Sequence, residues 1–221
     1  MSFLDNIFAT LERNGQTTVL EEIRDGQTVG TTGADLLDQV SRARASLVSR
    51  GLMKGDRFAL YANNGVRWVA MDLAAMAEGL IVVPLYARQA PAELVAMMKD
   101  CAPAMICCAD STLRDGILRE WPAAPTQLLF DDIFAAGSGA STQAPAKAVA
   151  ISDSDAVTII YTSGTSGEAK GVVLNAGNIA HMLGCVNARL DLLMAGHDGQ
   201  DRVFHYLPFV FAGSWMLLMK L

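Results

Sequence analysis

Short, continuously apolar segments alternate with helix-like segments along the first 136 residues of the chain. The predicted strands at 80–85 and 104–108 are apolar at successive positions rather than at every second one. Strands of this kind are buried on both faces, as in a parallel sheet that helices cover on each side. The sequence therefore predicts an α/β fold in which one or more layered, mostly parallel sheets are flanked by helices.

Helix caps, turn residues and apolar spacing predict the order of the elements. One helix begins after Ser2 and another after Thr32, with a hairpin turn at Asp25 and Gly26 between them. Beyond them the pattern predicts strands over 58–61, 80–85, 104–108, 127–130, 156–161, 171–174 and 202–206. Helices are predicted over 66–77, 91–99, 113–121 and 178–194.

A stretch rich in Gly, Ser, Ala and Pro, residues 137–148, interrupts this alternation. Such composition is typical of a linker. We therefore predict an N-terminal α/β subdomain over 1–136, a linker over 137–150, and the start of a second α/β portion over 151–221.

Composition and charge exclude several classes of protein. The 221 residues are 52% hydrophobic and 18% charged, which excludes a disordered chain. The net charge of −6 offers no bulk attraction for nucleic acid. The longest apolar run, 207–219, is shorter than the ~20 residues of a membrane-spanning helix, and the N-terminus does not resemble a signal peptide. Four Cys without a CxxC pair and three scattered His predict reduced thiols and no metal site. We expect a cytoplasmic protein without a transmembrane segment or a nucleic-acid partner.

The stretch 162–171 carries the most informative chemistry. Its glycines allow backbone N–H groups to approach an anion closely, and its hydroxyls and one lysine add further donors. It is not a Walker A loop, because Ala169 precedes Lys170 and Gly171 follows it. A small, polar β-hairpin loop without a ligand is the alternative that composition leaves open. The candidate phosphate-binding residues are Thr162, Ser163, Gly164, Thr165, Ser166, Gly167 and Lys170.

Residues 161–174 closely resemble the phosphate-loop signature of the adenylate-forming superfamily, which includes acyl-CoA synthetases, luciferases and peptide-synthetase adenylation domains. Residues 51–60, 79–86 and 91–94 resemble its early N-terminal segment, and Leu207 with Pro208 resembles the motif that follows. The resemblance covers nearly the whole chain in the right order. The run Val83 to Tyr86 is most similar to a long-chain or medium-chain acyl-CoA synthetase.

This resemblance implies the early part of an adenylate-forming N-terminal domain. It implies that ATP activates a carboxylic acid, a fatty acid, to an acyl-adenylate, and that coenzyme A then displaces AMP. The seven candidate residues would bind the β- and γ-phosphates, and Mg²⁺ would accompany ATP. The family's later motifs, its C-terminal domain and its catalytic lysine are not among the 221 residues, so we assign no catalytic residue and expect no ligase activity from this chain alone. A non-catalytic nucleotide- or acyl-binding module, or one half of a split assembly, is the alternative.

The chain departs from the family pattern at three positions. Ala169 stands where the family usually has Pro, Glu168 where a basic residue is frequent, and Phe211 where many members have His. A negative charge at Glu168 beside a phosphate site predicts weaker nucleotide affinity.

Several other residues admit a structural interpretation. We expect His205 to be structural or at the rim of the site, the Asp131-Asp132 pair to form a turn and helix cap, and Trp68, Met71 and Met76 to pack in the core. Two interpretations stay open for one aromatic group, an acyl-pocket border or a buried helix start: Phe209, Phe211, Trp215 and Met216. Without the later parts of the family fold, we expect residues 80–85, 159–161 and 207–219 to expose apolar faces, which would favour self-association.

Overall fold

The computed structural model describes residues 2–135, 147–163, 169–193 and 202–219. Its helices are α1 (Phe3–Arg13), α2 (Gly33–Ser49), α3 (Val66–Ala77), α4 (Pro91–Cys101), α5 (Ser111–Glu120), α6 (Asp131–Phe134), α7 (Ala176–Leu193) and α8 (Ala212–Leu218). Its strands are β1 (Thr18–Arg24), β2 (Gln27–Thr32), β3 (Arg57–Ala62), β4 (Ile81–Tyr86), β5 (Met105–Cys108), β6 (Gln127–Leu129), β7 (Ala156–Ser163) and β8 (Ala169–Asn175).

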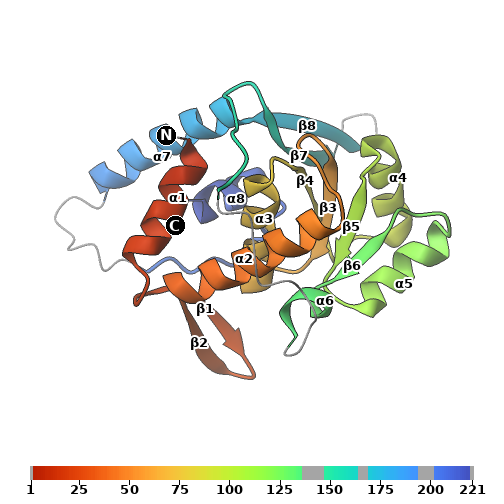
Figure 1. Cartoon of the computed structure of the whole chain (residues 1–221), viewed down its shortest axis with the longest axis horizontal. Coiled ribbons are helices and arrows are strands. Elements are labelled where there is room, and N and C mark those ends of the chain that lie inside the picture. The colour runs from red at the N-terminus through yellow and green to blue at the C-terminus, as the bar shows by residue number, and fades with distance from the viewer. Residues whose placement is uncertain (1, 136–146, 164–168, 194–201, 220–221) are drawn as a thin grey trace.

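A mostly parallel six-stranded sheet forms the centre of the molecule, as the apolar strands predict. Its order is β6-β5-β3-β4-β7-β8, and every neighbouring pair is parallel except β7 with β8. In Figure 1, α4 and α5 lie to the right of the sheet, while α1, α2 and α3 lie toward the viewer and the left. The antiparallel β1–β2 hairpin stands apart from this sheet, at the bottom of the view.

Side chains of the central strands alternate between two cores. Leu60 and Val82 pack on the side of α1, α2 and α3, whereas Ala59 and Val83 pack on the side of α4 and α5. Both faces of the parallel strands are therefore covered, which explains their continuous apolar sequence. Three residues of α3 expected in the core are buried there: Trp68, Met71 and Met76.

The adjacent thiols of Cys107 and Cys108 point to opposite cores. Both are buried and free, as the sequence predicts. Burial raises the pKa of both thiols, that of Cys108 to about 12. At neutral pH both residues are therefore neutral, apolar parts of the core.

The helix starts follow the predicted caps. Ser2 with Asp5 and Thr32 with Asp35 form reciprocal capping boxes at α1 and α2. Helix α3 has no side-chain cap of its own. Instead the backbone N–H of Val66 donates to Glu22 Oε1 of β1 at 2.6 Å, so the hairpin supplies a carboxylate to the positive end of α3.

The predicted strand over 202–206 is wrong. These residues have no regular secondary structure. Side chains take the place of a neighbouring strand: Arg202 pairs with Glu21, and the His205 ring bonds the Ser214 carbonyl at 2.9 Å. An apolar, β-prone sequence forms a strand only where the fold provides one beside it.

Polar side chains fix the segment that leads into β7. Arg44 of α2 bonds Glu78 at 2.7 Å and the Lys147 carbonyl at 2.8 Å. Lys54 bonds both the Ala150 carbonyl and Asp155. Of the predicted linker 137–150, residues 137–146 lie outside the described residues.

Candidate functional site

The carboxyl ends of β3 and β4 form a topological switch point. After β3 the chain turns into α3 on one face of the sheet, and after the neighbouring strand β4 it turns into α4 on the other. In open α/β sheets the loops that diverge in this way leave a crevice where ligands bind. Because β7 runs parallel to β4, the end of β7 with Thr162 and Ser163 lies at this same edge.

The predicted phosphate residues lie around the β7–β8 hairpin. Thr162 lies opposite Lys170, and Ser163 opposite Ala169, in the antiparallel register. Residues directly opposite each other share a face of the sheet, so the Thr162 hydroxyl and the Lys170 ammonium project from the same side. Both side chains are exposed, and Lys170 has no ion-pair partner in the described parts of the chain. The other candidates, Gly164, Thr165, Ser166 and Gly167, lie outside the described residues.

Tyr161 fixes the opposite face of β7 to α4. Its hydroxyl donates toward Asp100 and toward the Met97 carbonyl, 3.0 Å away. Burial, with the bond to the Asp100 carboxylate, raises the pKa of Tyr161 well above its ordinary value. The phenol therefore stays protonated at neutral pH and acts as a donor that fixes the strand carrying Thr162.

Gly171 makes room for this tyrosine. A Cβ atom at position 171 would lie 2.8 Å from the Ile159 side chain and 3.2 Å from the Tyr161 ring. The glycine of the family-like motif thus has a packing reason here: the ring of Tyr161 lies against its cross-strand partner without displacement.

A small cavity of about 70 Å³ lies at the carboxyl edge of β4. Tyr86, Gln89 and Tyr161 line it together with Val210 and Phe211 from the distant C-terminal segment. The rings of Tyr86 and Phe211 lie 6.0 Å apart, and Phe211 is 50% exposed. The half-exposed Phe211 ring therefore borders this cavity at the edge of the sheet.

The structure separates the four C-terminal residues into a buried set and one exposed residue. Phe209, Trp215 and Met216 are buried and belong to the core, whereas Phe211 lines the cavity. His205 contacts the Phe209 ring edge-on, and its Nε2 lies 2.9 Å from the Ser214 carbonyl. This bond confirms the structural role expected for His205.

Sequence reasoning missed two polar residues that hold this segment. Asn64, just after β3, bonds the backbone of Leu207 and Phe209, and Asp72 of α3 accepts a bond from the Trp215 indole at 2.7 Å. Desolvation by burial raises the pKa of Asp72 to about 7, although the Trp215 bond lowers it. The one signal in the sequence was an acidic residue within the otherwise apolar run of α3.

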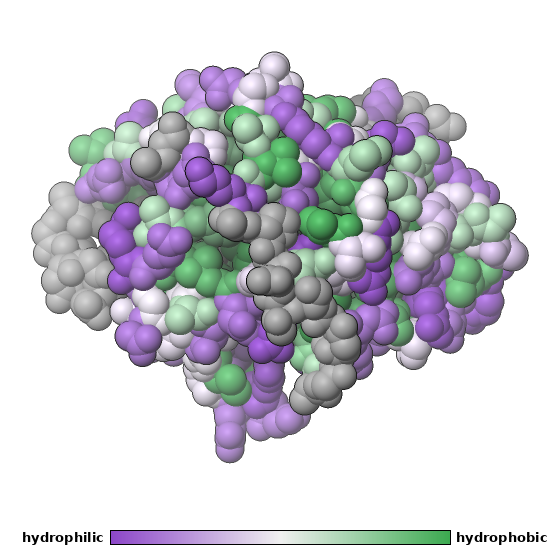
Figure 2. Space-filling model, viewed as in Figure 1, coloured by the Kyte–Doolittle hydropathy of each residue, from purple (hydrophilic) through white to green (hydrophobic). Residues whose placement is uncertain are grey.

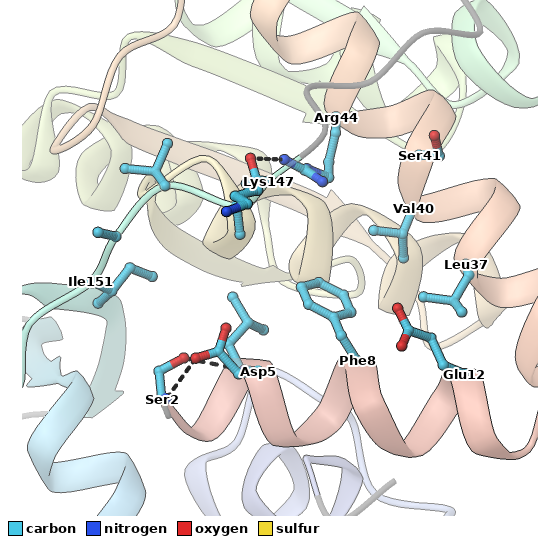
Figure 3. A pocket seen from close by; sticks show the side chains of 14 residues that line it. Ser2, Asp5, Phe8, Glu12, Leu37, Val40, Ser41, Arg44, Lys147 and Ile151 are labelled. Atoms are coloured by element: carbon cyan, nitrogen blue, oxygen red, sulfur yellow. Dashed lines mark hydrogen bonds between the residues drawn. The ribbon is translucent and has the colours of Figure 1, made fainter.

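A larger hollow, about 600 Å³, lies between α1, α2 and residues 147–151. Figure 3 shows two sets of polar groups in it that bond within the protein: Asp5 bonds Ser2, and Arg44 bonds the Lys147 carbonyl. Apolar side chains are visible in this hollow in Figure 2. None of the described phosphate candidates, Thr162, Ser163 and Lys170, lines it, so we assign the site to the sheet edge instead.

Two findings concern the described residues as a whole. They contain no group of three or more His, Cys, Asp or Glu side chains arranged to hold a metal ion. None of the helices in the described ranges is long and apolar enough to cross a membrane.

Residues 7–220 match the family model of the AMP-binding enzymes. The chain belongs to the AMP-binding enzyme family. The match confirms the resemblance to the adenylate-forming superfamily, which the sequence shows over nearly the whole chain.

Curated members of the AMP-binding family resemble the chain at moderate identity. The long-chain-fatty-acid–CoA ligase FadD15 of Mycobacterium bovis is 26% identical over 195 residues, which cover 80% of this chain and 32% of the relative. The mitochondrial medium-chain acyl-CoA ligase ACSF2 of Homo sapiens is 28% identical over 213 residues, covering 82% of this chain and 34% of the relative. The chain thus spans about a third of the length of these relatives.

Solved structures confirm the fold. ATP-bound MatB from Rhodopseudomonas palustris superposes with a TM-score of 0.75 at 26% identity, covering 100% of this chain and 43% of that one. VinN superposes with a TM-score of 0.81 at 22% identity, covering 98% of this chain and 53% of that one. The second likeness concerns the fold alone.

Proposed function

We propose that this chain forms the pyrophosphate-binding part of an enzyme that uses ATP to activate a fatty acid to an acyl-adenylate and then to an acyl-CoA. The observation that carries the proposal is the β7–β8 hairpin. It places the Thr162 hydroxyl and the Lys170 ammonium, which has no ion-pair partner among the described residues, on one face at the carboxyl edge of the sheet. The fatty acyl-CoA ligases among the relatives support the choice of acid.

Activation of a carboxylate is difficult because its attack on the α-phosphate drives negative charge onto the departing pyrophosphate. Lys170 and the Thr162 hydroxyl would bind and orient the β- and γ-phosphates and stabilise that charge. We assign the remaining phosphate contacts to Ser163, Gly164, Thr165, Ser166 and Gly167. Tyr161, fixed to α4, keeps the strand that carries Thr162 in place.

The described residues fit ATP better than they fit a resident metal. A cation and a hydroxyl at the hairpin suit phosphate oxygens, whereas no described carboxylate cluster suits Mg²⁺. Mg²⁺ in this proposal is therefore a companion of ATP, and no step is assigned to it. Coenzyme A enters as the co-substrate of the thioester-forming step, without assigned contacts.

Replacing Lys170 tests the phosphate role directly. We expect Lys170→Ala to weaken binding of inorganic pyrophosphate on the order of 10- to 100-fold, because a charge-assisted contact contributes ~1.5–3 kcal/mol. Isothermal titration calorimetry at fixed salt measures this change. The matched control is Lys147→Ala, which removes the same charge near α2 and should leave pyrophosphate affinity within about twofold. Equal losses in the two variants would contradict the assignment.

A second assay separates the ligase proposal from its alternative. We expect the 221 residues to bind pyrophosphate without releasing it from ATP when fatty acids are added, because adenylation needs the α-phosphate and the acid aligned with this end. A polypeptide that carries the remainder of a full-length relative can then be added. Pyrophosphate release restored by this addition would favour a split assembly. Fatty-acid-dependent release by the 221 residues alone would refute our expectation of inactivity.

The proposal also covers location and assembly. We propose a cytoplasmic protein that self-associates through exposed apolar surface. Two exposed valines on β8, one of the two edge strands of the sheet, support this: Val172 and Val173 are 46% and 56% exposed. Size-exclusion chromatography of the chain measures its oligomeric state.

A further inference from the structure

The side chain of Asn64 clamps a segment that lies 143 residues further along the chain. Its Nδ2 donates to the Leu207 carbonyl at 2.8 Å, and its Oδ1 accepts from the Phe209 N–H at 2.8 Å. One amide therefore satisfies two backbone groups on either side of Pro208, as a neighbouring strand would do. The Ser214 hydroxyl also donates to the Leu207 carbonyl, at 2.9 Å.

Two residues of α3 continue this contact at intervals of four. The Trp68 ring lies 5.2 Å from the Phe209 ring, and Asp72 accepts the bond from Trp215. Trp68 and Asp72 lie four residues apart in α3, so they share one helix face, and both contact the 207–215 segment. This segment is thus anchored at two ends, before and after Phe211.

The anchored segment delivers Phe211 to the carboxyl edge of β4. Between the Asn64 and Asp72 anchors, Val210 and Phe211 reach the cavity, and the Phe211 ring meets Tyr86. Asn64 lies in the loop after β3, and Tyr86 ends β4, so the two loops of the switch point act on the same segment. Asn64 itself is exposed and has no part in the apolar core.

We propose that Asn64 is a positioning residue for the acid-binding site, holding the backbone of Leu207 and Phe209 so that Phe211 contacts the acyl group at the cavity beside Tyr86. This inference rests on the proposed activation of a fatty acid. Asn64 acts through Phe211 and does not touch the acid. Trp68 and Asp72 of α3 hold the same segment at Phe209 and Trp215.

The test combines a structural and a binding readout on the 221-residue chain. In Asn64→Ala we expect the nuclear Overhauser contacts between the Tyr86 and Phe211 rings to be lost. We expect affinity for hexanoate, the acid used as a probe, to fall roughly tenfold, the lower end for a misplaced apolar contact. In Asn64→Asp the bond from Phe209 remains and the donation to Leu207 is lost, so an intermediate loss is expected.

A double-mutant cycle distinguishes positioning from simple stabilisation. In a Phe211→Ala background, Asn64→Ala should cost no further hexanoate affinity, because the ring it positions is gone. A residue that only stabilises the fold would lower the melting temperature equally in both backgrounds and leave hexanoate affinity unchanged. Equal affinity losses in both backgrounds would overturn the proposal, as would ring contacts that survive Asn64→Ala.

Failure of this inference can be told from failure of the proposed function. Wild-type chain that binds pyrophosphate but not hexanoate would overturn the role of Asn64 and leave the phosphate role of the hairpin intact. Wild-type chain that binds hexanoate with the predicted coupling, but no pyrophosphate, would support Asn64 and contradict the proposed phosphate site.

Discussion

Replacing Asp72 by asparagine should remove a pH dependence of several kcal/mol from the stability of the chain. Burial raises the pKa of the Asp72 carboxyl from its ordinary 3.8 to about 7 in the folded chain. The folded chain thus keeps a proton that the unfolded chain releases, and the free energy of unfolding falls as the pH rises from about 4 to about 7. At about 1.4 kcal/mol per unit the full loss is about 4 kcal/mol.

Urea unfolding at intervals between pH 4 and pH 8 measures this loss. Asp72→Asn keeps an oxygen for the Trp215 indole and cannot ionise, so its stability should be nearly flat across this window. Asp155, whose pKa is lowered to about 2 mainly by Lys54, acts in the opposite direction below pH 4 and does not interfere. Asp191→Asn, an exposed carboxylate on α7, is the matched control and should keep the wild-type slope. A slope that survives Asp72→Asn would show that another group causes it.

Trp215 tests the same carboxyl from the other side. Its hydrogen bond lowers the pKa of Asp72, so Trp215→Phe should move the midpoint of the pH transition upward. An upward shift of this midpoint would show that Trp215, in the segment that carries Phe211, stabilises the charged form of Asp72.

The sequence predicted the parts of the fold that short segments determine by themselves, namely the buried strands and the helix starts. Continuous apolar strands such as β4 require helices on both faces, and capping residues such as Ser2 and Thr32 fix where helices begin. The residues around Lys170 predict a phosphate site because their glycine and hydroxyl chemistry is visible in the sequence alone, and that assignment stays a prediction. Each of these predictions needs only a short segment of sequence and no knowledge of distant contacts.

Contacts between distant segments explain what the sequence could not show. Whether residues 202–206 form a strand depends on a neighbouring strand, and the structure supplies the Glu21 side chain and the Ser214 backbone carbonyl instead. Asn64 is an ordinary loop residue until Leu207 lies beside it. Phe209 and Phe211 are both phenylalanines in one apolar run, so the sequence does not distinguish them. The contacts with α3 bury Phe209, whereas Phe211 stays half-exposed at the cavity.

Breaking the Arg44–Glu78 pair should be the other large loss of stability. Arg44 Nε lies 2.7 Å from Glu78 Oε1, and the two side chains are only 12% and 7% exposed. Arg44→Met leaves the Glu78 carboxylate buried without its partner, which costs about 3–5 kcal/mol. The variant also loses the bond to the Lys147 carbonyl, so the segment that leads into β7 should exchange its amide hydrogens faster. Urea unfolding and hydrogen exchange at pH 7 measure the two effects.

The double variant Arg44→Met/Glu78→Leu separates the unpaired charge from the loss of packing. If the cost comes from the buried carboxylate, removing both charges should restore unfolding free energy to within about 1 kcal/mol of wild type. The exposed pair of Lys54 and Asp155 is the matched control, and Lys54→Met should cost no more than about 1 kcal/mol. A double variant as unstable as Arg44→Met would mean that the guanidinium stabilises α2 and residue 147 through its packing and its carbonyl bond. In that case amide exchange over residues 147–155 would stay fast in both variants, whereas recovery of slow exchange in the double variant would assign the effect to the Glu78 charge.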